Sequence, residues 1–229
     1  MRPATDPAQP APRQPRYRDG VRAAAGLSLA AFAFGVSFGV LARAADMGRL
    51  APVVMSATTF AGSAQFAVAS VLGAGGGVAT AGAAAVLLNL RYGPIGLSTA
   101  PSLTGPAWLR ALTAQLVVDE SWAIAQQGGG RVDRRLLVGV GAVLYATWVS
   151  GTAVGVLAGD LVVDPAKLGL DGAFPALFLA LLWPQLGSGS RRLAALAGAA
   201  IALVLIPVTG PGLPIVAASL ACLVGARRS

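Results

Sequence analysis

One arginine interrupts a long apolar run of this sequence. Arg91 lies inside residues 78–100, shortly after Asn89 and before Gly93 and Pro94. If this run crosses a bilayer, a charge inside it costs at least ~2.5 kcal/mol, so a retained arginine is a candidate site residue. Gly93 and Pro94 are expected to break the helix and free backbone groups to line a cavity. Such a guanidinium suits a carboxylate ligand; alternatively it snorkels or pairs with a structural acid.

Two adjacent acids lie inside another apolar run, residues 107–127. Asp119 and Glu120 point about 100° apart on a helix, so only one of them can face a given partner squarely. Either acid could pair with Arg91, receive an ammonium group or carry a proton. The alternative is that the helix is short and the acids lie near a membrane interface.

Two further segments carry candidate site residues. Phe60 is followed by Ser63 and Gln65, which offer donors and acceptors within an apolar helix. They are candidates to bind a solute, or they form hydrogen bonds between helices. Pro175 opens a short apolar run. Proline is ordinary in a first helical turn, but this one could also mark a half-helix whose N-terminus faces an anion.

The composition argues against catalysis and nucleic-acid binding. The chain has no histidine, one cysteine and no carboxylate set at metal-ligand spacing, so neither an enzyme nor a cofactor or metal site is indicated. The formal charge of +8 resides in short clusters between apolar runs rather than on one basic face, which argues against nucleic acid as a partner.

The elements that must hold these residues are membrane-spanning helices. Of the 229 residues, 55% are hydrophobic and 11% are charged, and the mean hydropathy is +0.71. Apolar runs near 20 residues recur, which is the length that a spanning helix needs. They do not alternate as barrel strands do. The sequence therefore predicts an all-α, polytopic integral membrane helix bundle of about 7–8 transmembrane helices, with broken helices among them.

The runs divide the chain simply. Residues 1–20, rich in Pro and Arg, are expected to form a disordered basic cytoplasmic tail, and residues 21–229 a single transmembrane transporter domain. The third run is expected to be either one span or a broken pair of half-helices. The predicted runs are 23–42, 51–72, 78–100, 107–127, 136–158, 174–186, 193–206 and 213–226.

Loop charges predict the orientation. Arginines precede the fifth run and end the chain, whereas the loop after the fifth run is acidic. The positive-inside rule then places both termini in the cytoplasm of a plasma-membrane protein. The first half of the chain fits less well, because Arg43 and Arg49 fall outside and Arg110 falls near the outer surface.

A short motif occurs twice. Residues 35–42 and 151–158 share the pattern GxxxGVLA, 116 residues apart. The similarity favours two internal repeats, about 21–130 and 136–226, as many transporters have. Chance similarity is the alternative, because Gly, Val, Leu and Ala are common in this chain.

These motifs together resemble the AzlC family, the large subunit of branched-chain amino acid exporters. The resemblance covers roughly residues 20–226. The features that carry it are Phe34-Gly35 to Ala42, Phe60-Ala61-Gly62-Ser63-Ala64-Gln65-Phe66, Asn89-Leu90-Arg91-Tyr92, Asp119-Glu120, and Gly172 to Phe178 with Pro175. The resemblance implies export of small hydrophobic amino acids with a small AzlD-type membrane subunit as partner.

The chemistry of the residues agrees with that implication. The carboxylate of an amino acid could meet Arg91, and its ammonium could meet Asp119 or Glu120. We expect the apolar side chain of the solute to lie among four phenylalanines, Phe34, Phe38, Phe60 and Phe66. With no ATP site, coupling to an ion gradient is expected. A passive channel or pore for small solutes is the alternative function, and a membrane-embedded enzyme lacks catalytic groups.

Overall fold

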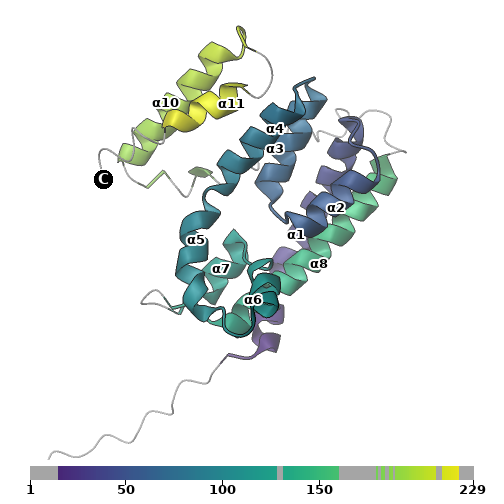
Figure 1. Cartoon of the computed structure of the whole chain (residues 1–229), viewed down its shortest axis with the longest axis vertical. Helices are drawn as coiled ribbons and strands as arrows, with labels where there is room; N and C mark the ends of the chain where they lie inside the picture. The colour runs from purple at the N-terminus through teal and green to yellow at the C-terminus, as the bar shows by residue number, and fades with distance from the viewer. Residues whose placement is uncertain are drawn as a thin grey trace, which may run out of the picture.

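The described part of the protein is helical. The computed structural model describes residues 15–127, 131–159, 189–209 and 213–221, together with 179, 182–183 and 186–187, and these residues form no strand beyond one isolated bridge between Gln126 and Val132. The helical class is therefore confirmed. The α-helices are α1 (Tyr17–Ala44), α2 (Leu50–Thr58), α3 (Gly62–Gly73), α4 (Val78–Asn89), α5 (Tyr92–Thr99), α6 (Ala107–Ala114), α7 (Asp119–Ala125), α8 (Arg134–Gly159), α10 (Gly189–Leu205) and α11 (Leu213–Ala218), with 3₁₀ turns η1 (Ala100–Ser102) and η4 (Ser219–Ala221) (Figure 1).

Two long helices form the centre of the fold. Among the described residues, α1 and α8 alone are long and apolar enough to cross a membrane. They correspond to the first and fifth predicted runs. α1 begins at Tyr17, inside the predicted tail, so residues 17–20 are helical. Most of the sixth run, including Pro175, lies outside the described residues, and the count of 7–8 spans stays a prediction.

Glycines let α1 and α8 pack backbone to backbone. A Cβ atom on Gly35 would lie 2.6 Å from the carbonyl oxygen of Trp148, and one on Gly155 would collide with the carbonyl of Val36. Such close approach is typical of small residues four apart in membrane helices. The two copies of GxxxGVLA thus contact each other, although this contact alone does not demonstrate a repeat.

The same contacts show that α1 and α8 run parallel. Gly20 lies against Gly139 near the beginning of both helices, and Gly39 lies against Gly155 near the end of both. If both helices cross the bilayer, their N-termini lie on one side. The chain between them must therefore cross back an odd number of times.

The second predicted run turns back instead of crossing. α2 and α3 are separated by Phe60, which adopts the left-handed region at φ 43°. α2 starts just after α1 ends, and Gly73 at the end of α3 lies beside Ala45, so both ends are at the C-terminal end of α1. The tip contacts the middle of α8, where Gly62 lies against Trp148. The pair forms a re-entrant hairpin, hairpin A (residues 50–73).

The third run is a broken pair of helices. α4 ends at Asn89 and α5 begins at Tyr92. The pair starts soon after α3 ends, at the C-terminal end of α1. It leads to Ser102, whose hydroxyl donates to the carbonyl of Val132, just before α8 begins. The structure shows that the helix is interrupted between Asn89 and Tyr92, as the broken-pair alternative expected. That the two halves together form one span stays a prediction.

The fourth predicted run also turns back. Before α6, Thr104 accepts a hydrogen bond from Arg134, and after α7 the carbonyl of Ala125 accepts one from the amide of Asp133. Both ends therefore lie where α8 begins, and α6 and α7 form hairpin B (residues 107–125). Arg110 lies at this end, so it shares a side with the starts of α1 and α8. The two expectations, a cytoplasmic N-terminus and Arg110 near the outer surface, are therefore incompatible, and the side itself stays a prediction.

The two hairpins enter from opposite ends and meet. Gln115, at the tip of hairpin B, donates to the carbonyls of Ala57 and Thr58 at 3.3 and 2.9 Å. Tyr145 of α8 donates to the same Ala57 carbonyl at 2.8 Å. Irregular backbone is tolerated at membrane depth only where protein or a cavity surrounds it. The meeting tips satisfy this condition for each other.

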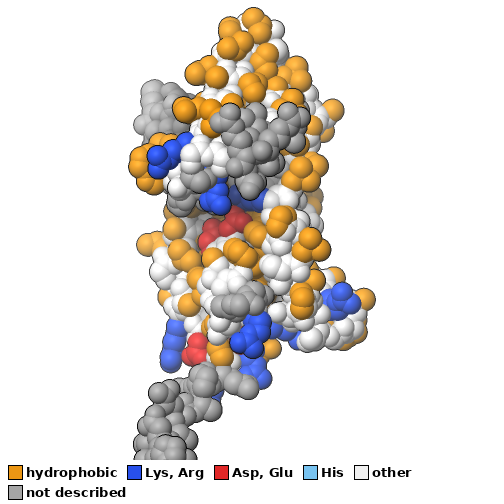
Figure 2. All heavy atoms as spheres, turned by 90° about the vertical axis from the view of Figure 1, so that its left-hand side faces the viewer, with side chains coloured by type: hydrophobic (Ala, Val, Ile, Leu, Met, Phe, Trp, Pro, Cys, Tyr) orange, Lys and Arg blue, Asp and Glu red, His pale blue; other side chains and the backbone are white. Residues whose placement is uncertain are grey.

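Apolar side chains cover the outside of the molecule. Large exposed examples occur along the long helices and the broken pairs, as expected for a surface in contact with lipid: Leu29, Leu50, Val78, Val86, Leu97, Trp108, Leu112 and Leu157. Figure 2 shows acidic and basic side chains in a hollow at mid-height of one face, with further basic side chains gathered at the lower end of that face.

A buried polar chain joins hairpin A to α8. The amide of Gln65, fully buried, donates to Ser56 Oγ at 2.8 Å and accepts from Trp148 Nε1 at 3.1 Å. Ser56 Oγ is also 2.8 Å from Thr152 Oγ1. Phe66 packs edge-on against Trp148 and Phe38 in the same core. Buried networks of this kind fix one arrangement only when all members are satisfied.

We expect Gly39→Leu to destabilise the protein. Its side chain would enter the backbone of α8 at Thr152 and Val156, and overpacking costs about 1–3 kcal/mol or more when backbone must shift. The melting temperature of the detergent-solubilised protein should fall well below that of the wild type. Gly26→Leu on the same helix is the control, because nothing lies within 4 Å of its Cβ position. Equal melting temperatures for the two variants would contradict the close packing of α1 on α8.

Gln65→Leu should destabilise the protein by another route. It leaves the buried indole N–H of Trp148 without its acceptor, at a cost of about 1–3 kcal/mol. Ser70→Ala on the exposed side of α3 is the matched control. Thermal unfolding of both proteins checks this, and a Gln65→Leu protein as stable as the control would show that the network does not hold hairpin A against α8.

Candidate functional site

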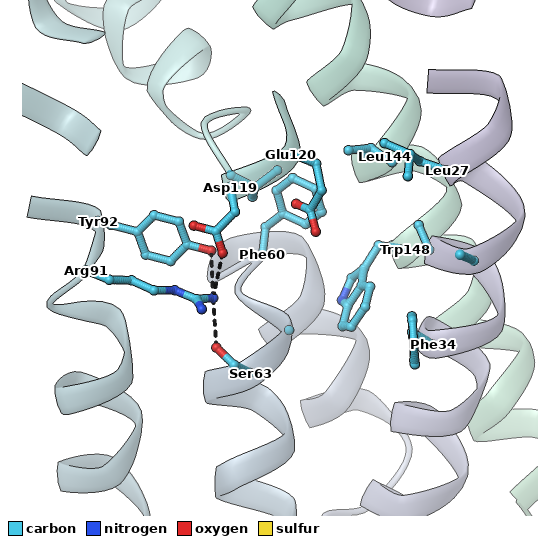
Figure 3. A pocket seen from close by; sticks show the side chains of 14 residues that line it. Leu27, Phe34, Phe60, Ser63, Arg91, Tyr92, Asp119, Glu120, Leu144 and Trp148 are labelled. Atoms are coloured by element: carbon cyan, nitrogen blue, oxygen red, sulfur yellow. Dashed lines mark hydrogen bonds and ion pairs between the residues drawn. The ribbon is translucent and has the colours of Figure 1, made fainter. Parts of the chain in front are cut away.

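The helix breaks meet at one cavity. The breaks between α2 and α3, α4 and α5, and α6 and α7 surround a cavity of about 280 Å³, called cavity 1, whose remaining wall is α1 and α8 (Figure 3). Its volume is near the lower end of ligand pockets, about 300–1,000 Å³, and suits a small solute. The lining residues are Leu27, Ala30, Ala31, Phe34, Phe60, Gly62, Ser63, Arg91, Tyr92, Val118, Asp119, Glu120, Leu144 and Trp148.

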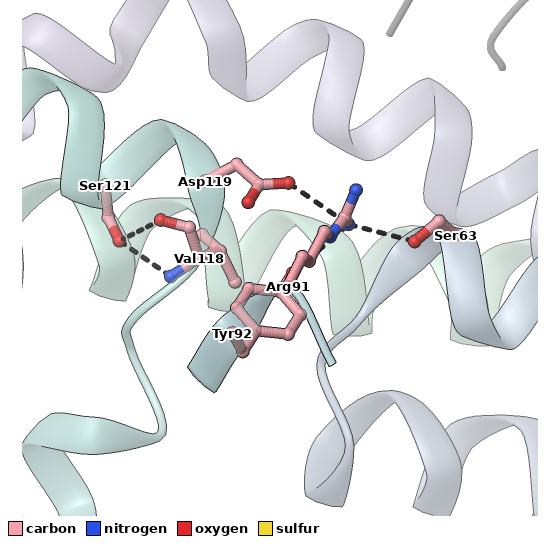
Figure 4. A network of polar contacts seen from close by, with 6 residues as sticks. All are labelled: Ser63, Arg91, Tyr92, Val118, Asp119 and Ser121. Carbon is pink, nitrogen blue, oxygen red and sulfur yellow. Dashed lines mark hydrogen bonds and ion pairs between the residues drawn. The ribbon is translucent and has the colours of Figure 1, made fainter. Parts of the chain in front are cut away.

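Arg91 joins the breaks. Its Nη2 atom lies 2.9 Å from Ser63 Oγ of hairpin A and 3.1 Å from Asp119 Oδ2 of hairpin B (Figure 4). The same nitrogen donates to the Tyr92 hydroxyl at 3.5 Å, and the guanidinium lies 5.2 Å from the centre of that ring. Nε is buried with no acceptor among the described residues. The guanidinium therefore keeps unused donor capacity while it holds both hairpins.

The acids occupy the first turn of α7. Ser121 accepts a hydrogen bond from the amide of Val118 and so closes the N-terminus of this short helix. Negative charge is favourable there because the helix dipole is positive at its N-terminus. Asp119 is paired with Arg91, whereas Glu120 lines cavity 1 and has no ion pair within the described residues. Figure 3 shows Glu120 on the side of the cavity nearer Leu27 and Trp148.

An apolar wall faces these charges. Phe34 and Leu27 of α1 and Leu144 of α8 lie beside the indole of Trp148 (Figure 3). Gln65 holds that indole by its N–H, so this residue acts on the cavity through Trp148. The wall gives cavity 1 one charged side and one apolar side.

The structure brings together most of the residues chosen from the sequence. Phe60, Ser63, Arg91, Asp119 and Glu120 all line cavity 1.

Other chosen residues lie elsewhere. Gln65 lies behind the wall of cavity 1, and Asn89 lines a separate, second cavity. Of the four phenylalanines, Phe34 and Phe60 line cavity 1, while Phe38 and Phe66 are fully buried in the core.

Sequence reasoning missed Tyr92 and Trp148 as lining residues. Tyr92 directly follows the arginine, and its aromatic hydroxyl could have signalled a role beside a buried charge. Trp148 precedes Gly151 by three positions, on the face of α8 that meets α1. Residues three apart on a helix share a face, so the glycine spacing in α8 could have indicated that Trp148 faces α1.

The arrangement fits a zwitterion. One guanidinium and two carboxylates line cavity 1. Because Arg91 pairs with Asp119, the carboxylate of Glu120 has no ion-pair partner among the residues that line the cavity. An ammonium group would compensate Glu120, and a carboxylate would use the remaining donors of Arg91. Within the described residues no group of three His, Cys, Asp or Glu side chains converges on a metal position.

Known proteins resemble this chain over most of its length. A protein of Archaeoglobus fulgidus described as an uncharacterized membrane protein is 34% identical over 81% of this chain and 82% of its own length. The inner membrane protein YgaZ of Escherichia coli is 27% identical over 90% of this chain and 87% of its own. The branched-chain amino acid transport protein AzlC of Bacillus subtilis is 26% identical over 82% and 75%.

No solved structure matches the chain significantly. The family model described as AzlC protein matches residues 26–162, which include both hairpins, Arg91 and the two acids. The match covers more than half of the sequence, and the relatives with 26–34% identity are membrane proteins. The chain belongs to the AzlC family, a family of membrane transport proteins.

Proposed function

We propose that this chain is the large subunit of a secondary transporter that exports branched-chain or other small hydrophobic amino acids. The observation that carries the proposal is cavity 1, in which a guanidinium and two carboxylates face an apolar wall at the meeting point of three broken helix pairs. Discontinuous helices at the bilayer midplane are where many transporters bind their solutes. The name of the Bacillus subtilis relative supports branched-chain amino acids as the solute class.

Each part of the solute has a partner in cavity 1. The carboxylate binds the guanidinium of Arg91, and the ammonium binds Glu120 with help from Asp119. The branched side chain lies against Phe34 and Trp148. Burying such a side chain contributes about 1.5–3 kcal/mol relative to leaving it in water, which favours leucine, isoleucine and valine over polar amino acids.

The ion pair between Arg91 and Asp119 can help to release the solute. Arg91 and Asp119 side chains are 35% and 33% exposed, so water reaches both charges and the pair can exchange partners. When a solute carboxylate takes Arg91, Asp119 is free for the ammonium. When the solute leaves, the two residues pair again and reconnect hairpin A with hairpin B through Ser63. Coupling to an ion gradient is part of the proposal, because no nucleotide site is indicated.

The basic residues support a cytoplasmic N-terminus. Arg18 and Arg22 at the start of α1 and Arg134 and Arg135 at the start of α8 lie at the same end of the molecule, and Arg110 joins them. Positive charge marks the cytoplasmic side of membrane proteins. A plasma-membrane location with both termini inside, and a small AzlD-type subunit as partner, complete the proposed assembly.

Arg91→Ala should strongly reduce leucine transport without unfolding the protein. A hydrogen bond to a charged group contributes about 1.5–3 kcal/mol, so its loss predicts a roughly ten- to hundredfold fall in leucine counterflow. Counterflow is measured in proteoliposomes that contain the protein and its membrane partner, with melting temperature as the check on folding.

Arg110→Ala is the control for Arg91→Ala, because Arg110 is an exposed arginine that lines neither described cavity. Unchanged counterflow in Arg91→Ala would remove the guanidinium from the solute site. Uptake without trans-acceleration in the wild type would instead favour a passive pore.

Ala31→Leu should change specificity. Its side chain would fill part of cavity 1 opposite the charged residues, so leucine transport should fall at least tenfold while glycine or alanine transport falls less. Ala33→Leu, which adds the same side chain to an exposed position of α1, should leave both rates unchanged. An equal loss of all solutes in Ala31→Leu would contradict the placement of the apolar side chain in cavity 1.

A further inference from the structure

A second cavity lies on the other side of an aromatic wall. It has a volume of about 220 Å³, is called cavity 2, and is lined mainly by α5 and by the tips of hairpins A and B. Phe60 and Tyr92 line both cavities. Because the same two residues line both spaces, we place them in the wall between the cavities.

The wall is held from both sides. Phe60 lies at the tip of hairpin A in the left-handed region and packs edge-on against Tyr145, with ring centres 5.1 Å apart. The Tyr92 hydroxyl accepts a hydrogen bond from Arg91. A residue other than glycine in the left-handed region persists only where its surroundings impose it, and such residues gather at functional sites. Because the Tyr92 hydroxyl binds Arg91, the position of the Tyr92 ring depends on the arginine of cavity 1.

Cavity 2 leads toward the end of the molecule where α8 begins. Its lining includes Thr99 and Leu103, and the next residue before Leu103, Ser102, binds the carbonyl of Val132 just before α8. Its inner end is formed by Asn89 and by Gln115, the residue that joins the two hairpin tips. Cavity 2 therefore lies between cavity 1 and the basic end of the molecule.

The lining of cavity 2 mixes polar and apolar side chains and is uncharged. None of the described residues that line it carries a formal charge. Asn89 Oδ1 is buried and has no hydrogen-bond donor among the described residues. A buried acceptor without a donor costs free energy, so a small rotation of Asn89 that turns Oδ1 toward a solute ammonium group would be favourable.

We propose that cavity 2 is a second, weaker site for the same zwitterionic amino acid, on the cytoplasmic side of cavity 1, and that Phe60 and Tyr92 close the passage between the two. The inference rests on the proposed function. Neutral groups hold a zwitterion less tightly than the charges of cavity 1, and passage needs sites from which a solute can also leave. A carboxylate that binds Arg91 would draw the guanidinium away from the Tyr92 hydroxyl and release the ring.

Cysteine accessibility tests the passage. Cys222, the sole cysteine of the sequence, is first replaced by Ser. Single cysteines are then introduced at Ala114 in cavity 2 and at Ala31 in cavity 1. Ala111→Cys, exposed on the same helix as Ala114, is the control. A membrane-impermeant cationic thiosulfonate is added to inside-out vesicles of cells that express the protein with its partner.

We expect Ala114→Cys to react from this side, with the rate at least threefold lower in saturating leucine. Ala111→Cys, next to Arg110 at the basic end and outside both cavities, should react at a rate that leucine does not change, and Ala31→Cys should react slowly. Tyr92→Ala should raise the rate at Ala31→Cys at least tenfold. Tyr92→Phe, which keeps the ring but loses the hydroxyl that binds Arg91, should raise it by an intermediate amount, because the ring is released but still present. Phe60→Ala removes the other ring of the wall and should also raise the rate at Ala31→Cys.

Two results would overturn the proposal. The first is an unreactive Ala114→Cys, and the second is an Ala31→Cys rate that neither Tyr92→Ala nor Phe60→Ala changes. Protection of Ala114→Cys by leucine tests the proposed function. The change in the Ala31→Cys rate caused by Tyr92→Ala or Phe60→Ala tests the aromatic wall, so the two hypotheses can fail separately.

Discussion

The candidate site depends on one partly exposed cation that is shared between helix breaks. Arg91 stands where α4 gives way to α5, and a single nitrogen of its guanidinium reaches Ser63 on hairpin A and Asp119 on hairpin B. A charge at such a position is costly unless polar groups surround it. The breaks supply these groups, because each ends a helix and brings side chains and backbone to the same point. The helix breaks therefore provide the polar partners that Arg91 needs, and cavity 1 lies among these polar groups.

The rest of the structure holds the breaks in place. α1 and α8 approach so closely at Gly39 and Gly155 that they act as one rigid support. Hairpin A is fixed to this support by the buried chain of Gln65, Trp148 and Ser56. Hairpin B is attached to hairpin A by Gln115. Neither hairpin crosses the molecule, so the polar tips meet in the interior, where a solute of mixed polarity finds charge on one side and aromatic surface on the other.

The sequence predicted the chemistry better than the topology. Arg91, Asp119 and Ser63 were recognisable because polar groups inside apolar runs are costly, and their proximity follows from the need for partners. Hairpins A and B were not recognisable, because an apolar run of about 20 residues has the same composition whether it crosses or turns back. Gln65 was a site candidate, with hydrogen bonds between helices as the alternative, and the structure shows the alternative, because its amide binds Ser56 and Trp148.

The most direct test of this account is to find on which side of the membrane the hairpin ends lie. Single cysteines at Asp46 and Ala74 flank hairpin A, and cysteines at Ala107 and Gln127 flank hairpin B. Labelling of right-side-out and inside-out vesicles with an impermeant maleimide assigns each position to a side. The account predicts that 46 and 74 share one side and that 107 and 127 share the other. Labelling of 46 and 74 from opposite sides would show that hairpin A crosses the membrane, and the meeting of two re-entrant tips at Arg91 would be refuted.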